Sequence, residues 1–132
     1  MKHVEVVCAI IVNDKGEVFC TKRGPGRALE GFWEFPGGKV ENNETHEETI
    51  IREIKEELNS NIKPIKYIGK VDHEYTNLDS PFSITMYGYL CKLIEGELTL
   101  SEHTAKQWVT LDKLKDIEFA EADIPFINMI NK

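Results

Sequence analysis

Apolar residues along this chain fall into short runs that are separated by polar turns. The first run, VEVVCAIIV, predicts a buried strand over residues 4–12. An Asn-Asp-Lys-Gly turn follows, and a second strand is expected over residues 17–22. Later strand-like runs cover residues 62–75, 82–94 and 106–111. This pattern predicts a protein that is rich in strands.

One segment in the middle of the chain has the spacing of an amphipathic helix. Thr45 and Glu48 form a capping box, which places the helix start near Thr45. Ile51, Ile54 and Leu58 recur at i, i+3 and i+7 and predict a buried stripe. Glu53, Glu56 and Glu57 fall beside this stripe and not on it.

The rest of the chain completes a mixed pattern. A tight glycine-rich turn is expected at residues 36–38, and two short helical segments are expected near 112–116 and from about 122 onward. Strands before and after a helix predict the α/β class, folded as an α/β/α sandwich with a mixed sheet. No linker or repeat divides the 132 residues, so one domain over 1–132 is expected.

Composition narrows the class of protein. No apolar run approaches the ~20 residues that span a bilayer, and the N-terminus lacks the features of a signal peptide. Cys8, Cys20 and Cys91 lie in strand-like contexts without C-x-x-C spacing. We interpret them as reduced, buried residues rather than a zinc site or a catalytic thiol. A cytoplasmic protein without membrane contact is expected.

Charge restricts the partners. The net charge of −7 argues against binding a nucleic acid polymer, because such binding rewards basic patches. It does not argue against a small polyphosphate, since an acidic pocket that binds divalent cations becomes locally positive.

Three acidic residues of the predicted helix carry the strongest chemical signal. Glu53, Glu56 and Glu57 stand at i, i+3 and i+4, and at ~3.6 residues per turn this spacing places them on one helix face. Their carboxylates repel one another, and a hard cation such as Mg²⁺ would relieve the repulsion. The alternative is a solvated acidic face, as most charge runs are.

The surrounding residues resemble a known motif, the Nudix box, G-x5-E-x7-R-E-U-x-E-E-x-G-U, where U is apolar. Residues 38–60 match it at Gly38, Glu44, Arg52, Glu53, Ile54, Glu56 and Glu57. The resemblance implies a single Nudix hydrolase domain. Two positions depart from the motif: Asn59 stands for glycine and Ser60 for an apolar residue. Asn is the next best residue for a left-handed helix end, and the Ser60 change is expected to be peripheral, with Ile62 available to pack.

The Nudix resemblance implies roles for the residues of the box. Glu53, Glu56 and Glu57 would bind a divalent metal, expected to be Mg²⁺ with Mn²⁺ as a substitute, and the Gly37 carbonyl would add a ligand. Glu53 or another box glutamate would orient or deprotonate the attacking water. Arg52 would pair with these carboxylates and fix their geometry, and Glu44 would do similar work.

A second candidate metal ligand lies outside the box. Glu102 stands six residues before Trp108, in a Ser-Glu-His loop. In MutT-like Nudix proteins a glutamate of this loop also binds metal, and the alternative is a solvated loop acid.

Within the family, the chain resembles the MutT subgroup and, within it, the CTP pyrophosphohydrolase branch. The stretches that carry this resemblance are residues 4–12, 21–23, 33–39, 102–103 and 122–125. The substrate contacts that it implies are Arg23, Phe35, Gly38, Lys39 and Asp123. Arg23 would face a phosphate or the base, although it also fits a surface charge, and Phe35 would stack or pack near the base, although it also fits the core.

Asp123 bears on the choice of base. Oxidised-guanine MutT enzymes have asparagine at the matching place, which both donates and accepts, whereas an ionised Asp only accepts. A carboxylate therefore favours an amino group such as cytosine N4. Asp123 also fits a helix N-cap before Ile124 and Pro125, and the two roles are compatible.

The expected activity is Mg²⁺-dependent hydrolysis of nucleoside triphosphates to monophosphate and pyrophosphate, which would sanitise the nucleotide pool. (d)CTP or modified pyrimidine triphosphates are the favoured substrates, and 8-oxo-dGTP is the alternative. A nucleoside diphosphate-sugar or dinucleoside polyphosphate hydrolase is a further enzyme interpretation, and a catalytically inactive nucleotide-binding module is one of another class. The partner is expected to be a small nucleotide, and the protein a monomer or homodimer.

Overall fold

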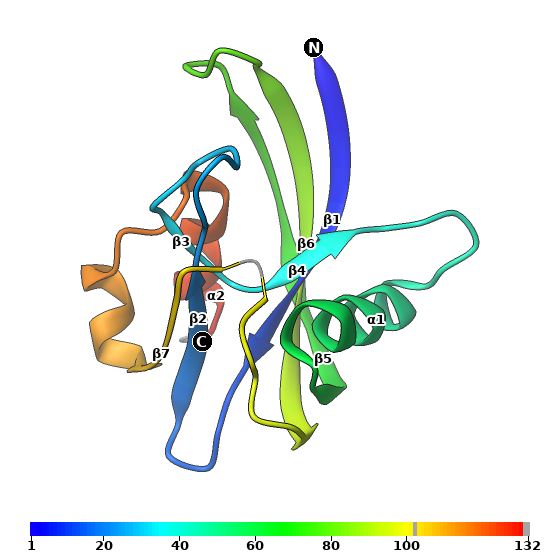
Figure 1. Ribbon diagram of the computed structural model, residues 1–132, viewed down its shortest axis with the longest axis vertical. Helices are drawn as coiled ribbons and strands as arrows, with labels where there is room; N and C mark the ends of the chain where they lie inside the picture. The colour runs from blue at the N-terminus through cyan, green and yellow to red at the C-terminus, as the bar shows by residue number, and fades with distance from the viewer. Residues whose placement is uncertain (102, 131–132) are drawn as a thin grey trace.

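The computed structural model describes residues 1–101 and 103–130 of the chain. Figure 1 shows two sheets and two main helices. The elements in chain order are β1 (Lys2–Ile11), β2 (Glu17–Lys22), β3 (Trp33–Glu34), β4 (Gly37–Lys39), α1 (His46–Leu58), β5 (Asn61–Tyr75), β6 (Phe82–Glu95), β7 (Ala105–Thr110), the 3-10 helices η1 (Leu111–Asp116) and η2 (Glu121–Asp123), and α2 (Ile124–Ile130).

The larger sheet is mixed, as the sequence predicts. Its four strands have the order β4-β1-β6-β5, and β1 pairs parallel with β6 while the other pairs are antiparallel. The smaller sheet has the order β3-β2-β7 and is antiparallel. Figure 1 shows α1 on one side of the large sheet, with α2 and the small sheet on the other. The α/β/α sandwich is therefore confirmed.

Strand β1 is buried on both faces because it lies between these layers. Val7, Ala9 and Ile11 face the cluster that contains α1, whereas Cys8 and Ile10 face the cluster between the two sheets. This double burial explains why the sequence reads as a continuous apolar run instead of an alternating one.

Helix α1 begins as expected. The Thr45 side chain accepts the Glu48 N–H, and the Glu48 side chain accepts the Thr45 N–H. The predicted buried stripe was wrong at one position, because Ile51 is 40% exposed and Ile50 is fully buried. Ile50, Ile54 and Leu58 follow i, i+4 and i+8 spacing, which makes an apolar stripe equally well.

The end of α1 contains one confirmed and one wrong prediction. Asn59 adopts the left-handed conformation with φ 48°, as expected for the glycine position of the motif. Ser60 is not peripheral, since it is 1% exposed. Its hydroxyl donates to the Leu58 carbonyl at 2.9 Å and accepts the Leu98 N–H at 2.8 Å. It therefore ties the helix end to the segment after β6.

The predicted tight turn at residues 36–38 is also wrong. Gly37 and Gly38 begin the short strand β4, which pairs with Cys8 and Val7 of β1. A Cβ on Gly37 would collide with the carbonyl oxygen of Val7. The glycines therefore permit a close approach of two strands rather than a turn. The three cysteines are buried and free, as expected. Within residues 1–101 and 103–130, no helix has the length and apolar composition to cross a membrane.

Candidate active site

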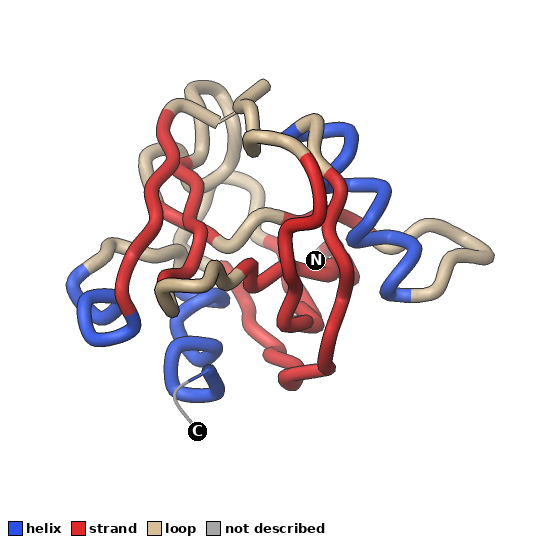
Figure 2. Tube along the Cα trace, turned by 90° about the horizontal axis from the view of Figure 1, so that it is seen from below, coloured by secondary structure: helices blue, strands red, loops and turns tan. Residues whose placement is uncertain are grey.

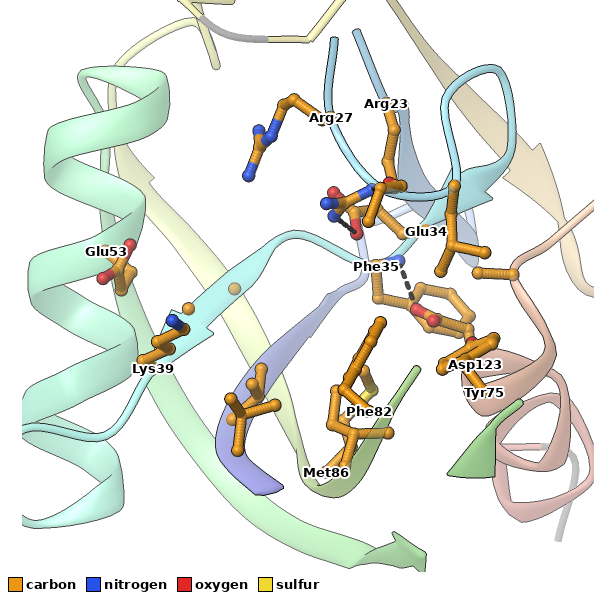
Figure 3. Close-up of a pocket in the computed structure, with 18 of the residues that line it drawn as sticks. Arg23, Arg27, Glu34, Phe35, Lys39, Glu53, Tyr75, Phe82, Met86 and Asp123 are labelled. Atoms are coloured by element: carbon orange, nitrogen blue, oxygen red, sulfur yellow. Dashed lines mark hydrogen bonds and ion pairs between the residues drawn. The ribbon is translucent and has the colours of Figure 1, made fainter. Parts of the chain in front are cut away.

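A cavity of about 730 Å³ lies between α1, β4 and the C-terminal segment. Figure 3 shows its two ends, with Glu53 of α1 at one and Asp123 at the other. Figure 2 views the chain from below, with the strands of the two sheets standing beside one another. The cavity is lined by residues that are far apart in the sequence, such as Val4, Glu53 and Asp123. The chain passes from β3 of the small sheet through β4 of the large sheet to the loop before α1.

The acidic end of the cavity is formed by α1. Glu53 and Glu57 both line it, and they lie one turn apart on the helix. The Glu56 side chain is 59% exposed and lies 3.2 Å from Arg52. Among the residues that the structure describes, no three His, Cys, Asp or Glu side chains gather as a metal-binding group. The structure thus brings two of the predicted carboxylates into the cavity and places the third beside the arginine.

Arg52 holds the acidic residues of the box together. Its Nε donates to Glu44 at 2.7 Å, and its Nη1 donates to Glu53 at 3.0 Å. It also donates to the Lys39 carbonyl at 3.3 Å. The hydrogen bond from Arg52 lowers the pKa of the Glu44 carboxyl to about 2. Arg52 therefore pairs with carboxylates of the box, and the role of this pairing in fixing their geometry stays a prediction.

Gly38 and Glu53 are in direct contact. A Cβ built on Gly38 would overlap the carboxylate of Glu53. The absence of a side chain at Gly38 therefore leaves the space in which the Glu53 carboxylate lies.

The donor set at this end fits a hard divalent cation. Glu53, Glu57, Gly37 and Gly38 all line the cavity, and carboxylate and carbonyl oxygens are the ligands that such a cation prefers. Glu102, the predicted ligand from another loop, lies outside the described residues.

Arg23 and Glu34 line the middle of the cavity and belong to a partly buried polar network that also includes His103. Arg23 Nη1 lies 2.7 Å from Glu34 Oε1, and His103 Nε2 lies 2.8 Å from Glu34 Oε2. Burial alone would raise the pKa of Glu34, but the hydrogen bond from His103 and the charge of Arg23 lower it. Arg23 is thus a paired residue of the cavity wall rather than a surface charge. Sequence reasoning missed Glu34 and His103 as site residues, although both stand in the stretches that resemble MutT.

The far end of the cavity contains Asp123, which is 2% exposed. Its Oδ2 accepts the Phe35 N–H at 2.9 Å, so the carboxyl reaches across to the β3–β4 link. Burial raises the pKa of Asp123 well above its usual value, and the charge of Glu34 raises it further. Phe35 is itself buried, and the centroid of its ring lies 4.9 Å from the centroid of the Phe119 ring. Phe35 therefore belongs to both the core and the cavity wall.

The remaining walls are basic and apolar. Lys39 lines the cavity, as expected, and so do two basic residues that the sequence did not single out, Lys2 and Arg27. Tyr75 and Phe82 form part of the apolar wall. Their positions carry no special signal in the sequence, because both belong to strand-like apolar patterns.

Comparison with known proteins places this fold and cavity in a family. The NUDIX domain model matches residues 1–129. Among relatives, the chain is 30% identical over 132 residues to the 8-oxo-dGTP diphosphatase of Escherichia coli K12, covering 100% of this chain and 99% of that protein. It is 32% identical over 127 residues to the CTP pyrophosphohydrolase of the same strain, covering 96% and 90%.

Solved structures agree with the sequence comparison. The solution structure of the E. coli ORF135 protein matches with a TM-score of 0.81 at 30% identity, covering 99% of this chain and 90% of that one. The MutT protein of methicillin-resistant Staphylococcus aureus 252, a Nudix hydrolase, matches with a TM-score of 0.76 at 37% identity, covering 98% and 97%. The chain therefore belongs to the NUDIX family and is a MutT-like hydrolase.

Proposed function

We propose that the protein is a Mg²⁺-dependent nucleoside triphosphate pyrophosphohydrolase that releases a nucleoside monophosphate and pyrophosphate. The observation that carries the proposal is the single cavity that runs from Glu53 and Glu57, past the basic residues Arg23 and Lys39, to Asp123. A nucleotide needs this order of groups: a cation site beside its phosphates, positive charge along them, and a polar group at the base.

The residues divide the chemical work between them. A divalent cation bound at Glu53 and Glu57 would neutralise charge on the phosphate oxygens and lower the pKa of a bound water. The Glu53 carboxylate, which accepts a hydrogen bond from Arg52 at 3.0 Å, would orient the attacking water and accept its proton. Lys39 and Arg23 would hold the phosphates of the substrate. The enzyme would act on free nucleotides in the cytoplasm, as a monomer or homodimer.

The position of bond cleavage gives a direct test. Hydrolysis in ¹⁸O water is expected to yield nucleoside monophosphate and pyrophosphate, with the label in one of these two products. Mass spectrometry of both products measures this. Nucleoside diphosphate with labelled orthophosphate would contradict the proposal, and a lack of any metal-dependent pyrophosphate release would favour a binding module without catalysis.

We propose cytosine triphosphates as the preferred substrates, on the basis of Asp123. When it is ionised, its carboxylate accepts hydrogen bonds only and suits an amino donor such as cytosine N4. The raised pKa of this buried carboxyl favours 8-oxo-dGTP as a second candidate, because a neutral carboxyl both donates and accepts, as asparagine does. Base preference would then depend on the protonation state of Asp123.

Substitution of Asp123 by asparagine tests this assignment. At a pH above the pKa of Asp123, Asp123→Asn is expected to lower kcat/KM for dCTP about tenfold, because a charge-assisted bond of roughly 1.5–3 kcal/mol gives way to a neutral one of ~1 kcal/mol. The value for 8-oxo-dGTP should hold or rise. Steady-state kinetics with both substrates measures the change, and an unaltered ratio would remove Asp123 from base selection.

The pH dependence of the wild-type enzyme provides a further readout. Since the folded-state pKa of Asp123 is raised, the carboxyl is neutral below that pKa and ionised above it. The ratio of kcat/KM for dCTP over 8-oxo-dGTP should therefore rise with pH in the wild type. It should stay flat in Asp123→Asn, which does not titrate.

A further inference from the structure

One hydrogen bond links the wall of the cavity to the segment that carries Asp123. Tyr75, at the end of β5, is 6% exposed and lines the cavity. Its hydroxyl oxygen accepts the main-chain N–H of Ala122 at 2.8 Å. Ala122 directly precedes Asp123, and Figure 3 shows Tyr75 beside Asp123 at the same end of the cavity.

The ring of Tyr75 is held in place by aromatic neighbours. The centroid of the Tyr75 ring lies 5.1 Å from that of Phe82, which also lines the cavity, and 4.5 Å from that of His73. Burial raises the pKa of the Tyr75 hydroxyl to about 12, so the group stays neutral over the physiological range. A neutral, fixed hydroxyl is a constant acceptor for the Ala122 N–H.

Other hydrogen bonds also hold the segment around Asp123, including the Ala120 N–H, which donates to the Trp33 carbonyl at 2.9 Å. The Asp123 N–H donates to Ala120 within the same turn, and its carboxyl accepts the Phe35 N–H. His73 lies 3.1 Å from Glu121, but the Glu121 side chain is 69% exposed, and exposed pairs contribute little. The bond from Ala122 to Tyr75 is thus a buried hydrogen bond between this turn and β5.

We infer that Tyr75 is a positioning residue for base selection: its ring forms the wall beside the base, and its hydroxyl fixes the direction of the Asp123 carboxyl. The inference rests on the proposed function, in which Asp123 contacts the base. A small rotation of the turn would move the carboxyl away from a base edge, and hydrogen bonds weaken steeply with misalignment.

Tyr75→Phe keeps the ring and removes only the hydroxyl. We expect it to change the ratio of kcat/KM for dCTP over 8-oxo-dGTP about tenfold, which corresponds to roughly 1.4 kcal/mol, mainly through KM. Tyr87→Phe is the matched control, since the Tyr87 hydroxyl donates to Glu5, which is outside the cavity lining. It should leave the ratio unchanged. Thermal unfolding of both variants separates a change of stability from a change of selection.

A double-mutant cycle tests whether Tyr75 acts through Asp123. In the Asp123→Ala background, Tyr75→Phe should alter the ratio by less than about twofold, because the group that it positions is gone. A full effect in that background, or none in the wild-type background, would overturn the inference.

Two measurements keep this inference apart from the proposed hydrolysis. The first measurement is hydrogen exchange by NMR, in which Tyr75→Phe should exchange the Ala122 amide proton faster than the wild type. The second is titration of each protein with dCMP and with 8-oxo-dGMP, in which the ratio of the two binding affinities should change in Tyr75→Phe without any turnover. If the wild type hydrolyses no nucleoside triphosphate, the proposed function fails and these spectra still decide the role of Tyr75. If the wild type is active but exchange and preference stay unchanged, the inference alone fails.

Discussion

Replacement of Glu57 by glutamine is expected to lower kcat by about two to four orders of magnitude at saturating Mg²⁺, with the fold retained. Glu57 lines the cavity with Glu53, and a neutral amide is a weaker ligand for a hard cation than a carboxylate. Steady-state kinetics over a range of Mg²⁺ concentrations, together with circular dichroism, measures both parts of the expectation.

Two companion variants sharpen this test. Glu47→Gln removes the same charge from an exposed site in the first turn of α1 and should leave kcat unchanged. Glu56→Gln distinguishes between two roles of Glu56, which are pairing with Arg52 and binding the metal. If Glu56 acts only by holding Arg52, the loss should be about 10- to 100-fold, whereas a metal ligand should match the loss of Glu57→Gln. Full activity of Glu57→Gln at low Mg²⁺ would refute the metal site.

Gly38→Ala is expected to lower kcat about 100-fold, since a misplacement of about 1 Å in a catalytic group has this effect. The new Cβ would overlap the Glu53 carboxylate, which must then move. The backbone at Gly38 is not in the left-handed region, so alanine brings no conformational strain of its own. Kinetics at saturating substrate measures the loss, and thermal unfolding checks that the fold survives.

The cause of this loss can be isolated by removing the group that is displaced. In a Glu53→Ala background there is no carboxylate to move, so Gly38→Ala should lower the remaining activity by less than about threefold. An equal loss in both backgrounds would mean that Gly38 contributes through the strand β4 and not through Glu53.

The sequence predicts the parts of the site that depend on local spacing. The capping box of Thr45 and the left-handed Asn59 follow from rules that act over a few residues. The position of Arg52 beside Glu44 and Glu53 follows from the motif and the helical repeat. These predictions needed no knowledge of how distant segments meet.

The missed features depend on contacts between distant segments. Glu34 and His103 are 69 residues apart, and Tyr75 and Ala122 are 47 apart. The sequence predicts a peripheral Ser60, but its partner in the fold, Leu98, is 38 residues away. A serine hydroxyl can be buried when such a partner satisfies it, and no pattern within the box indicates that partner.

The parallel pairing of β1 with β6 has a consequence for folding. His3 and Ser83 are register partners although 80 residues separate them. The antiparallel β5–β6 pair needs only a short hairpin and is expected to form first. During synthesis at roughly 5–20 residues per second, β1 must therefore wait for several seconds, with β4 as its one available neighbour in the large sheet, before β6 leaves the ribosome. Asp123 follows β7 in the chain, so the far end of the cavity can form only after the strands of both sheets have been synthesised.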